Sequence, residues 1–174
     1  MSIGLIVQGF GQIRNLGKIK RDYLFKKRDT THTFSIWNND GHPPKCYVQN
    51  GLLVMSQDST STRDFKGLVG KQVDLSKYRK VIFEIESATW LPNSYVWITI
   101  RKNPSYDIWG QGQQVRRVDI FNYKEPKTYP NYPNKYKAII DVSELSGSYG
   151  VGLCIQSGGG SYGNIQFKNI YLEK

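Results

Sequence analysis

The sequence predicts an all-β protein, a β-sandwich of jelly-roll type with a basic N-terminal arm. Short runs of alternating apolar and polar residues recur along the chain, separated by Gly, Ser, Asn or Pro, which is typical of roughly eight to ten short strands. Aromatic residues make up 13% of the chain and there are 17 glycines, whereas sustained runs of good helix formers are nearly absent. We therefore expect helix to be limited to a turn or two.

Length and charge divide the chain into two predicted parts. At 174 residues it fits one domain that folds without disulfides or metals, and we place this domain at residues 31–174. Residues 1–30 hold seven basic and two acidic residues, so half of the net charge of +10 lies in this predicted arm. Such an arm is either a solvated segment that serves solubility or a contact for a polyanion or partner. The candidate contact residues of the arm are Lys18, Lys20, Arg21, Lys26, Lys27 and Arg28.

The cysteines and the apolar residues near the start limit which cofactors and which cellular compartment we expect. Cys46 and Cys154 are the only cysteines, far apart and without CxxC spacing, which predicts two reduced thiols and no metal or cofactor. The apolar residues 3–7 form a run too short for a secretion signal or a membrane span. We expect no export signal and no membrane partner.

The last third of the chain has the clearest alternation, and it predicts three strands, at 138–142, 151–157 and 164–172. In the last of these, two apolar pairs are out of phase by one residue, which a bulge near Lys168 and Asn169 would reconcile. Gly-Ser-Tyr-Gly occurs at 147–150 and again at 160–163. This repeat predicts a hairpin-type turn at each end of the middle strand.

The remaining elements follow from the same alternation and from turn residues. Asn50-Gly51 is a favoured type I′ turn, so residues 46–49 and 52–56 are predicted to form a hairpin. Residues 73–78 are predicted to form a short helical turn or corner. The other predicted strands are 32–37, 80–87, 95–101 and 115–121, and the predicted loops are 56–66, 102–114 and 123–137.

Three segments carry a resemblance to a known fold family: Val-Asp-Leu-Ser-Lys-Tyr at 73–78, Ala-Ile-Ile-Asp-Val-Ser-Glu-Leu at 138–145, and Ile-Gln-Phe-Lys-Asn-Ile-Tyr-Leu-Glu at 165–173. Together they resemble the galactose-binding-like jelly rolls of carbohydrate-binding modules, over the chain from about Cys46 onward. Because these are corner and edge patterns, the resemblance implies a fold more than a ligand. The small size and the lack of an export signal are closer to phage tail and other virion structural proteins, several of which look like such jelly rolls.

Aromatic residues beside polar groups are the candidate ligand contacts. Strand parity places Trp97 on the same face as Arg101, opposite the apolar side chains, so we expect an exposed indole on which a sugar ring stacks. A Trp97 covered by a loop or a subunit interface is the alternative. Glu84 and Glu86 are expected on a solvated strand face, paired with Arg101 or Arg117 across neighbouring strands. The candidate ligand residues are Trp97, Arg101, Glu84, Trp109, Tyr106, Tyr129 and Tyr132.

The sequence predicts no catalytic site. Gly159, Ser161 and Gly163 match the letters of a nucleophile elbow, but a predicted strand follows instead of a helix, and the chain has only two histidines. Glu84 and Glu86 are spaced so that their carboxyls could lie close together, as in a glycosidase, but glutamates on the solvated face of a strand are ordinarily hydrated. We therefore expect a protein that is not an enzyme.

These observations predict a non-catalytic binding or structural protein, namely a phage or prophage virion component of tail or adhesion type that assembles in the host cytoplasm. Its partners would be a glycan or other virion subunits, and homo-oligomers are expected because aromatic-rich loops are often covered at an interface. Two alternatives stay open. One is a free carbohydrate-binding module for a polysaccharide, and the other is a nucleic-acid-binding protein, which the basic and aromatic composition favours.

Overall fold

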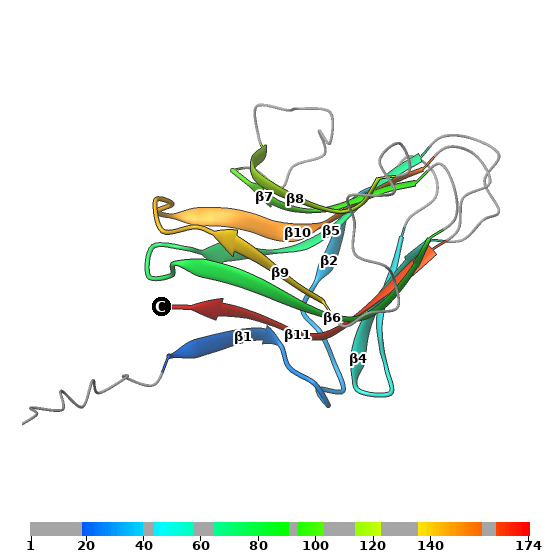
Figure 1. The fold of residues 1–174 in the computed structure, drawn as a ribbon, viewed down its shortest axis with the longest axis horizontal. Helices are drawn as coiled ribbons and strands as arrows, with labels where there is room; N and C mark the ends of the chain where they lie inside the picture. The colour runs from blue at the N-terminus through cyan, green and yellow to red at the C-terminus, as the bar shows by residue number, and fades with distance from the viewer. Residues whose placement is uncertain are drawn as a thin grey trace, which may run out of the picture.

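The computed structural model describes residues 19–39, 44–57, 65–90, 94–102, 114–122, 136–157 and 163–174. In these ranges the regular structure is strand, and the strands form two antiparallel sheets that stack face to face (Figure 1). No helix in the described ranges is long and apolar enough to cross a membrane. The predicted all-β sandwich is confirmed.

Six strands form the sheet that we call sheet A. They are β1 (Arg21–Phe25), β3 (Lys45–Gln49), β4 (Leu52–Gln57), β6 (Lys80–Trp90), β9 (Tyr136–Asp141) and β11 (Gly163–Glu173). The order is β3, β4, β11, β6, β9, and β1 pairs with β11 beyond the end of β4. β11 is the centre of this sheet, since it pairs with β6 on one side and with β4 and then β1 on the other.

Five strands form the opposite sheet, sheet B. They are β2 (Ser35–Asn39), β5 (Phe65–Asp74), β7 (Ser94–Arg101), β8 (Gln114–Asn122) and β10 (Ser148–Ser157). The order is β2, β5, β10, β7, β8, so β10 is the centre of sheet B. Figure 1 shows β7, β8 and β10 in the upper layer and β1, β6 and β11 in the lower layer.

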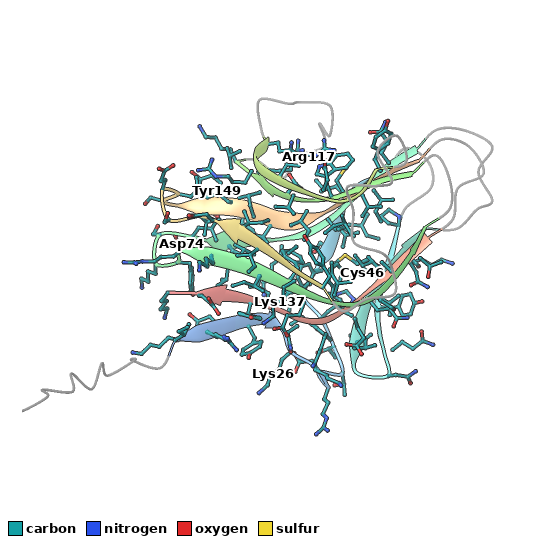
Figure 2. All side chains as sticks on the ribbon, viewed as in Figure 1. Lys26, Cys46, Asp74, Arg117, Lys137 and Tyr149 are labelled. Atoms are coloured by element: carbon teal, nitrogen blue, oxygen red, sulfur yellow. The ribbon has the colours of Figure 1, made fainter. Side chains whose placement is uncertain are left out.

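The core lies between the sheets and is apolar. Alternate side chains of each central strand point into it, because side chains in a strand alternate between the two faces. The rings of Phe83 and Phe167 meet edge to face, with centroids 5.6 Å apart. Figure 2 shows that side chains from both sheets fill the space between them. Completely buried core residues include Phe83, Ile98, Val151, Leu153, Ile165, Phe167 and Ile170.

Two corners of the fold use the same three-residue pattern, Asp-x-Ser at 74–76 and at 141–143. In each, the Asp side chain accepts hydrogen bonds from the backbone N–H and from the hydroxyl of the Ser two residues later. These bonds, led by the one from the Ser hydroxyl, hold the pKa of both carboxyls below the ordinary value. The middle residue, Leu75 or Val142, is buried. The corner predicted at 73–78 is confirmed for residues 75–78, which turn after β5, whereas residues 73 and 74 belong to that strand.

The predicted hairpin and bulge are confirmed. Asn50 and Gly51 both have positive φ, 53° and 71°, as a type I′ turn requires, and they join the antiparallel strands β3 and β4. The pairing of β11 with β6 shifts register on both sides of Phe167, next to the predicted position. The bulge brings both Phe167 and Ile170 to the core face.

β5 is a strand that the sequence does not predict. Residues 65–74 pair with β10 over their whole length and with β2 on the other side, whereas the sequence predicts a loop up to residue 66, a corner from residue 73 and no element between them. The apolar pair Leu68 and Val69 is surrounded by glycines and polar residues, so no period-two pattern is visible. The segment has no strong intrinsic preference for β structure, so pairing with two neighbouring strands is what holds it extended.

The predicted hairpin turns at the Gly-Ser-Tyr-Gly segments are wrong. β9 and β11 belong to sheet A whereas β10 belongs to sheet B, so both connections cross between the sheets. Residues 158–162 lie outside the described residues, and Gly147 has a positive φ of 97° as expected for a turn. The local turn chemistry is correct, but it cannot specify which strands pair.

The boundary between arm and domain also differs from the prediction. Residues 21–25 were placed in a separate arm, but they form β1, which extends sheet A by pairing with β11. Phe25 is 1% exposed and belongs to the core. Charged residues on the outer face of this strand hide its structural role in the sequence. Residues 1–18 lie outside the described residues.

Candidate functional site

The outer face of sheet B carries Trp97, the most prominent candidate ligand residue. Its side chain points away from the core, whereas those of Val96 and Ile98 point into it, so the predicted parity is correct. The prediction of an exposed indole is nevertheless wrong, because Trp97 is only 6% exposed. Its ring packs against Leu68 of β5 and Cys154 of β10, both of which are completely buried.

Arg117 of the edge strand β8 covers the indole. Its guanidinium carbon lies 4.3 Å from the centroid of the Trp97 ring, within cation–π distance. The same guanidinium forms an ion pair with Asp119, and the two side chains are 39% and 30% exposed. The solvent-facing part of this patch is therefore charged, and the aromatic ring lies beneath it.

Gln114 fixes the orientation of the indole. Its side-chain oxygen accepts one hydrogen bond from Trp97 Nε1 at 2.9 Å and another from Thr99 Oγ1 at 3.1 Å. Thr99 is completely buried, and Arg101 on the same face is 1% exposed. Both lie in β7, which pairs with β10 on one side and with β8 on the other.

Glu84 lies in β6, on the outer face of sheet A, so the core separates it from Trp97 and Arg101. The structure thus does not bring these three candidate residues together. The predicted pairing of Glu84 with Arg101 or Arg117 is also wrong, since both arginines are in sheet B. The order of the strands in the two sheets decides this, and alternation within one strand gives no information on it.

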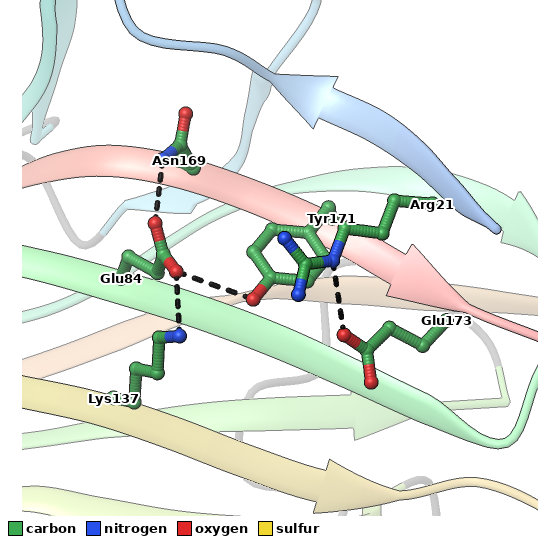
Figure 3. Close-up of polar contacts among 6 residues, drawn as sticks. All are labelled: Arg21, Glu84, Lys137, Asn169, Tyr171 and Glu173. Carbon is green, nitrogen blue, oxygen red and sulfur yellow. Dashed lines mark hydrogen bonds and ion pairs between the residues drawn. The ribbon is translucent and has the colours of Figure 1, made fainter. Parts of the chain in front are cut away.

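Three side chains from two neighbouring strands hold the Glu84 carboxylate (Figure 3). Lys137 of β9 donates to Oε1 at 2.9 Å and the Tyr171 hydroxyl of β11 donates to the same oxygen at 3.2 Å, while the Asn169 amide donates to Oε2. Burial raises the pKa of Glu84, but the hydrogen bonds from Asn169 and Lys137 outweigh burial and keep this pKa below its ordinary value. Glu84 is therefore an ionised acceptor.

The network continues to β1 through aromatic and charged contacts. The Arg21 guanidinium lies 4.7 Å from the centroid of the Tyr171 ring and bonds Glu173 at 3.1 Å (Figure 3). The Tyr23 ring packs against the Tyr171 ring, with centroids 5.4 Å apart, and Tyr23 is 42% exposed. Arg21, a predicted arm residue, therefore has a structural role on sheet A.

A hollow of about 460 Å³ lies beside this network, at the edge of sheet A where β9 begins. We call it the Glu84 hollow. Of the polar network, Glu84 and Lys137 line the hollow. The hollow is large enough for a small ligand. Its lining residues are Glu84, Ile85, Glu86, Tyr136, Lys137 and Lys168.

Some of the other candidate residues lie within the described part of the chain, and the rest lie outside it. Lys20 precedes β1, and Lys26, Lys27 and Arg28 follow it in an exposed turn. Lys26 N–H donates to the Asp29 side chain at 2.8 Å, which closes this turn. The residues that lie outside the described part of the chain, and whose roles stay predictions, are Lys18, Tyr106, Trp109, Tyr129 and Tyr132.

Sequence reasoning missed Lys137, Lys168 and Asp119, and it assigned Arg117 to Glu84 instead of to the Trp97 indole. Lys137 and Lys168 look like ordinary surface lysines, and Arg117 and Asp119 lie on a strand whose apolar phase is irregular. Within the described residues no group of three or more His, Cys, Asp or Glu side chains could hold a metal ion. Burial raises the pKa of the Cys46 thiol to about 12, which makes it a poor nucleophile at neutral pH.

The sequence matches no family profile and no curated protein. The fold does match solved structures. The carbohydrate-binding module TmCBM61, in complex with β-1,4-galactotriose, gives a TM-score of 0.53 at 11% sequence identity, over 87% of this chain and 97% of that one. A family 29 carbohydrate-binding module gives a TM-score of 0.48 at 9% identity, over 90% of each chain.

The match to TmCBM61 supports the class of fold. The chain has the jelly-roll β-sandwich of carbohydrate-binding modules, as its corner and edge patterns predict. At this level of identity the likeness is one of fold, so the ligand has to be inferred from the chain's own surfaces.

Proposed function

We propose that the protein is a non-catalytic carbohydrate-binding protein whose ligand occupies the Glu84 hollow. The observation that carries the proposal is the hollow itself, where a carboxylate, ammonium groups and a tyrosine converge on about 460 Å³ at the edge of a carbohydrate-binding-module fold. A concave site with a few convergent polar groups beside a ring is a typical small-ligand site.

The groups in the hollow have hydrogen-bonding capacity left for sugar hydroxyls. The Glu84 carboxylate offers about four acceptor positions, and three are used by Lys137, Tyr171 and Asn169. The Lys137 ammonium has three donors, and its contacts with Glu84 and Tyr171 do not use all of them. Because the Lys137 side chain is 52% exposed and that of Glu84 is 18% exposed, a ligand can reach both.

The electrostatics of Glu84 support binding over catalysis. A glycosidase needs one carboxyl that stays protonated at working pH, which requires a raised pKa. The hydrogen bonds from Asn169 and Lys137 lower the pKa of Glu84 instead. An ionised carboxylate with fixed partners accepts hydrogen bonds from hydroxyl groups and does not donate a proton.

Isothermal titration calorimetry tests the proposal directly. The ligands are β-1,4-linked galacto-oligosaccharides, chosen because TmCBM61 was solved with β-1,4-galactotriose, and manno- and cello-oligosaccharides for comparison. We expect binding that weakens about tenfold or more in Lys137→Ala and Lys168→Ala, since each loses a charge-assisted donor. Lys77→Ala is the matched control, because Lys77 is exposed on a corner remote from the hollow.

The outer face of sheet B is the rival surface, and Arg117→Ala discriminates it. If the glycan lies over Trp97, this variant changes affinity while Lys137→Ala does not. A wild-type protein that binds none of these oligosaccharides, or that cleaves them, contradicts the proposed function.

The biological setting is a separate prediction. A virion component is expected to form a stable ring or trimer, whereas a free carbohydrate-binding module is expected to be monomeric, so light scattering coupled to size-exclusion chromatography separates the two. The nucleic-acid alternative predicts DNA binding that falls steeply with salt concentration.

A further inference from the structure

A second hollow, distinct from the Glu84 hollow, lies between the end of β1, the segment 28–33 and β5. Its volume is about 480 Å³. We call it the basic hollow, because two permanent cations line it together with four hydroxyl groups, those of Tyr23 and three threonines, and a single carboxylate, that of Asp29. Its polar lining includes Arg28, Thr30, Thr31, His32, Thr33 and Lys71.

Arg28 occupies this position in a backbone conformation that disfavours it. Its φ is +80°, in the left-handed region that favours Gly or Asn. The conformation is held by a hydrogen bond from Arg28 N–H to the Gly51 carbonyl at 3.0 Å, and a side chain on Gly51 would come within 3.0 Å of Arg28 Cα. Glycine would relieve the strain at this position, whereas the arginine places a guanidinium in the lining of the hollow.

The Arg28 guanidinium has no hydrogen-bond or ion-pair partner among the described residues. All its donors are therefore available to a ligand in the hollow. Strained residues of this kind concentrate at binding sites, where the surrounding structure fixes them. Here the surroundings are the tip of the β3–β4 hairpin and the turn closed by Lys26 and Asp29.

Lys71 supplies the second cation from β5. Its ammonium donates to Thr33 Oγ1 at 2.7 Å, which fixes its direction and leaves two donors. The Asp29 carboxylate accepts one hydrogen bond, from Lys26 N–H at 2.8 Å, and its negative charge offsets one of the two cations, while His32 Nε2 donates to the Cys46 carbonyl at 3.0 Å. The free donors of the hollow thus exceed its free acceptors.

We propose that the basic hollow binds a tetrahedral oxyanion, a phosphate or sulfate group, in free form or carried by a polymer. The planar guanidinium fork and the ammonium match the oxygens of such a group, and the threonine hydroxyls add neutral donors. The two hollows share no lining residue, although Tyr23, which lines the basic hollow, packs on Tyr171 of the Glu84 network.

Calorimetric titration with inorganic phosphate and with sulfate at low ionic strength tests the proposal. Arg28→Gly is the informative variant, because it removes the guanidinium and also suits the positive φ. We expect its thermal unfolding temperature to equal or exceed that of the wild type while phosphate affinity falls about tenfold, and Lys71→Gln to weaken binding similarly. Lys27→Gln is the control, since Lys27 is an exposed cation on the same turn but does not line the hollow.

Two results would overturn the proposal. One is a wild-type protein that binds neither anion, and the other is a loss in Lys27→Gln equal to that in Arg28→Gly, which indicates a diffuse charge effect. Titration with dextran sulfate and with a phosphodiester polymer identifies the source of the anion. If the natural ligand is a polymer that carries the anion, one of these polymers binds more tightly than the free anion. If the natural ligand is a free ion, neither does. Lys137→Ala leaves phosphate binding unchanged if the two sites are independent, so failure of one proposal is distinguishable from failure of the other.

Discussion

Glu84 is a side chain whose partners, more than its position in sequence, determine its chemistry. It lies on an outward-facing position of β6, yet Lys137, Asn169 and Tyr171 surround its carboxylate. Each of these partners comes from a strand that pairs with β6 in sheet A. A negative charge at this point therefore depends on correct assembly of three strands.

The pH dependence of stability reports on this charge. The folded pKa of Glu84 is lowered, so its contribution to stability is present above the ordinary pKa of about 4.5 and is lost as the pH falls through the folded value. We expect Glu84→Gln to lose roughly 1 kcal/mol of unfolding free energy at pH 7. At pH 3 the difference from the wild type should be smaller, as measured by urea unfolding.

Glu144→Gln is the control for this experiment. Glu144 pairs with Arg116 at 3.2 Å, but its side chain is 83% exposed, so removal of its charge should leave stability nearly unchanged at both pH values. A difference between wild type and Glu84→Gln that stays constant from pH 7 to pH 3 would contradict a lowered pKa.

At the scale of elements, close approach of two strands requires glycine in β10. A Cβ on Gly152 would lie 2.3 Å from the Val69 carbonyl oxygen in β5, which is far inside contact distance. The obstacle is backbone on a paired strand, so it cannot move without breaking the β5–β10 ladder. Gly152 is thus part of the pairing that makes an unpredicted segment into a strand.

Gly152→Ala should therefore destabilise the protein by about 3 kcal/mol or abolish folding, in line with overpacking of a rigid site. Gly147→Ala is the matched control, because Gly147 has a φ of +97° but nothing within 4 Å of its Cβ position. Its expected cost is only the conformational one, about 1 kcal/mol. Equal losses in the two variants, measured by chemical denaturation, would show that the contact with Val69 is unimportant.

Elements with their own periodicity could be predicted from sequence, and elements defined by neighbours could not. β6, β7 and β11 alternate clearly, and even the bulge near Phe167 was visible as a change of phase. β5 has only Leu68 and Val69 as apolar residues in its central part, so its extended form depends on β2 and β10. β1 could not be predicted either, because its charged residues mask the alternation of a strand and its extended form depends on pairing with β11.

At the scale of the whole molecule, β1 extends sheet A and closes one end of the sandwich. Its partner residues in β11 run from Ile170 to Glu173. Phe25 enters the core, while Tyr23 lies on the outer face. A segment that looks like a charged arm thus contributes to the global stability of the fold.

We expect Phe25→Ala to cost about 3 kcal/mol or more, the usual range for a buried aromatic residue. Tyr23→Ala in the same strand should cost less than half of that, because Tyr23 is 42% exposed. Urea unfolding of both variants distinguishes a structural strand from an arm, for which neither substitution would matter.

The sequence could predict which side chains point outward, but not to which of the two sheets they belong. Trp97 and Glu84 both point outward as predicted, yet they lie on opposite sheets. Arg117, which covers the indole, belongs to a strand whose register with β7 includes irregularities. Strand order and register depend on tertiary packing, which one sequence does not display.

The central place of β11 has a consequence for biosynthesis. This strand comes last among the described strands, and it pairs with three others that are made long before it. While it is still within the ribosome, the exposed sides of β4 and β6 have no permanent neighbour and are open to association with other chains. Translation that stalls before residue 163 should therefore yield a product that aggregates or is degraded.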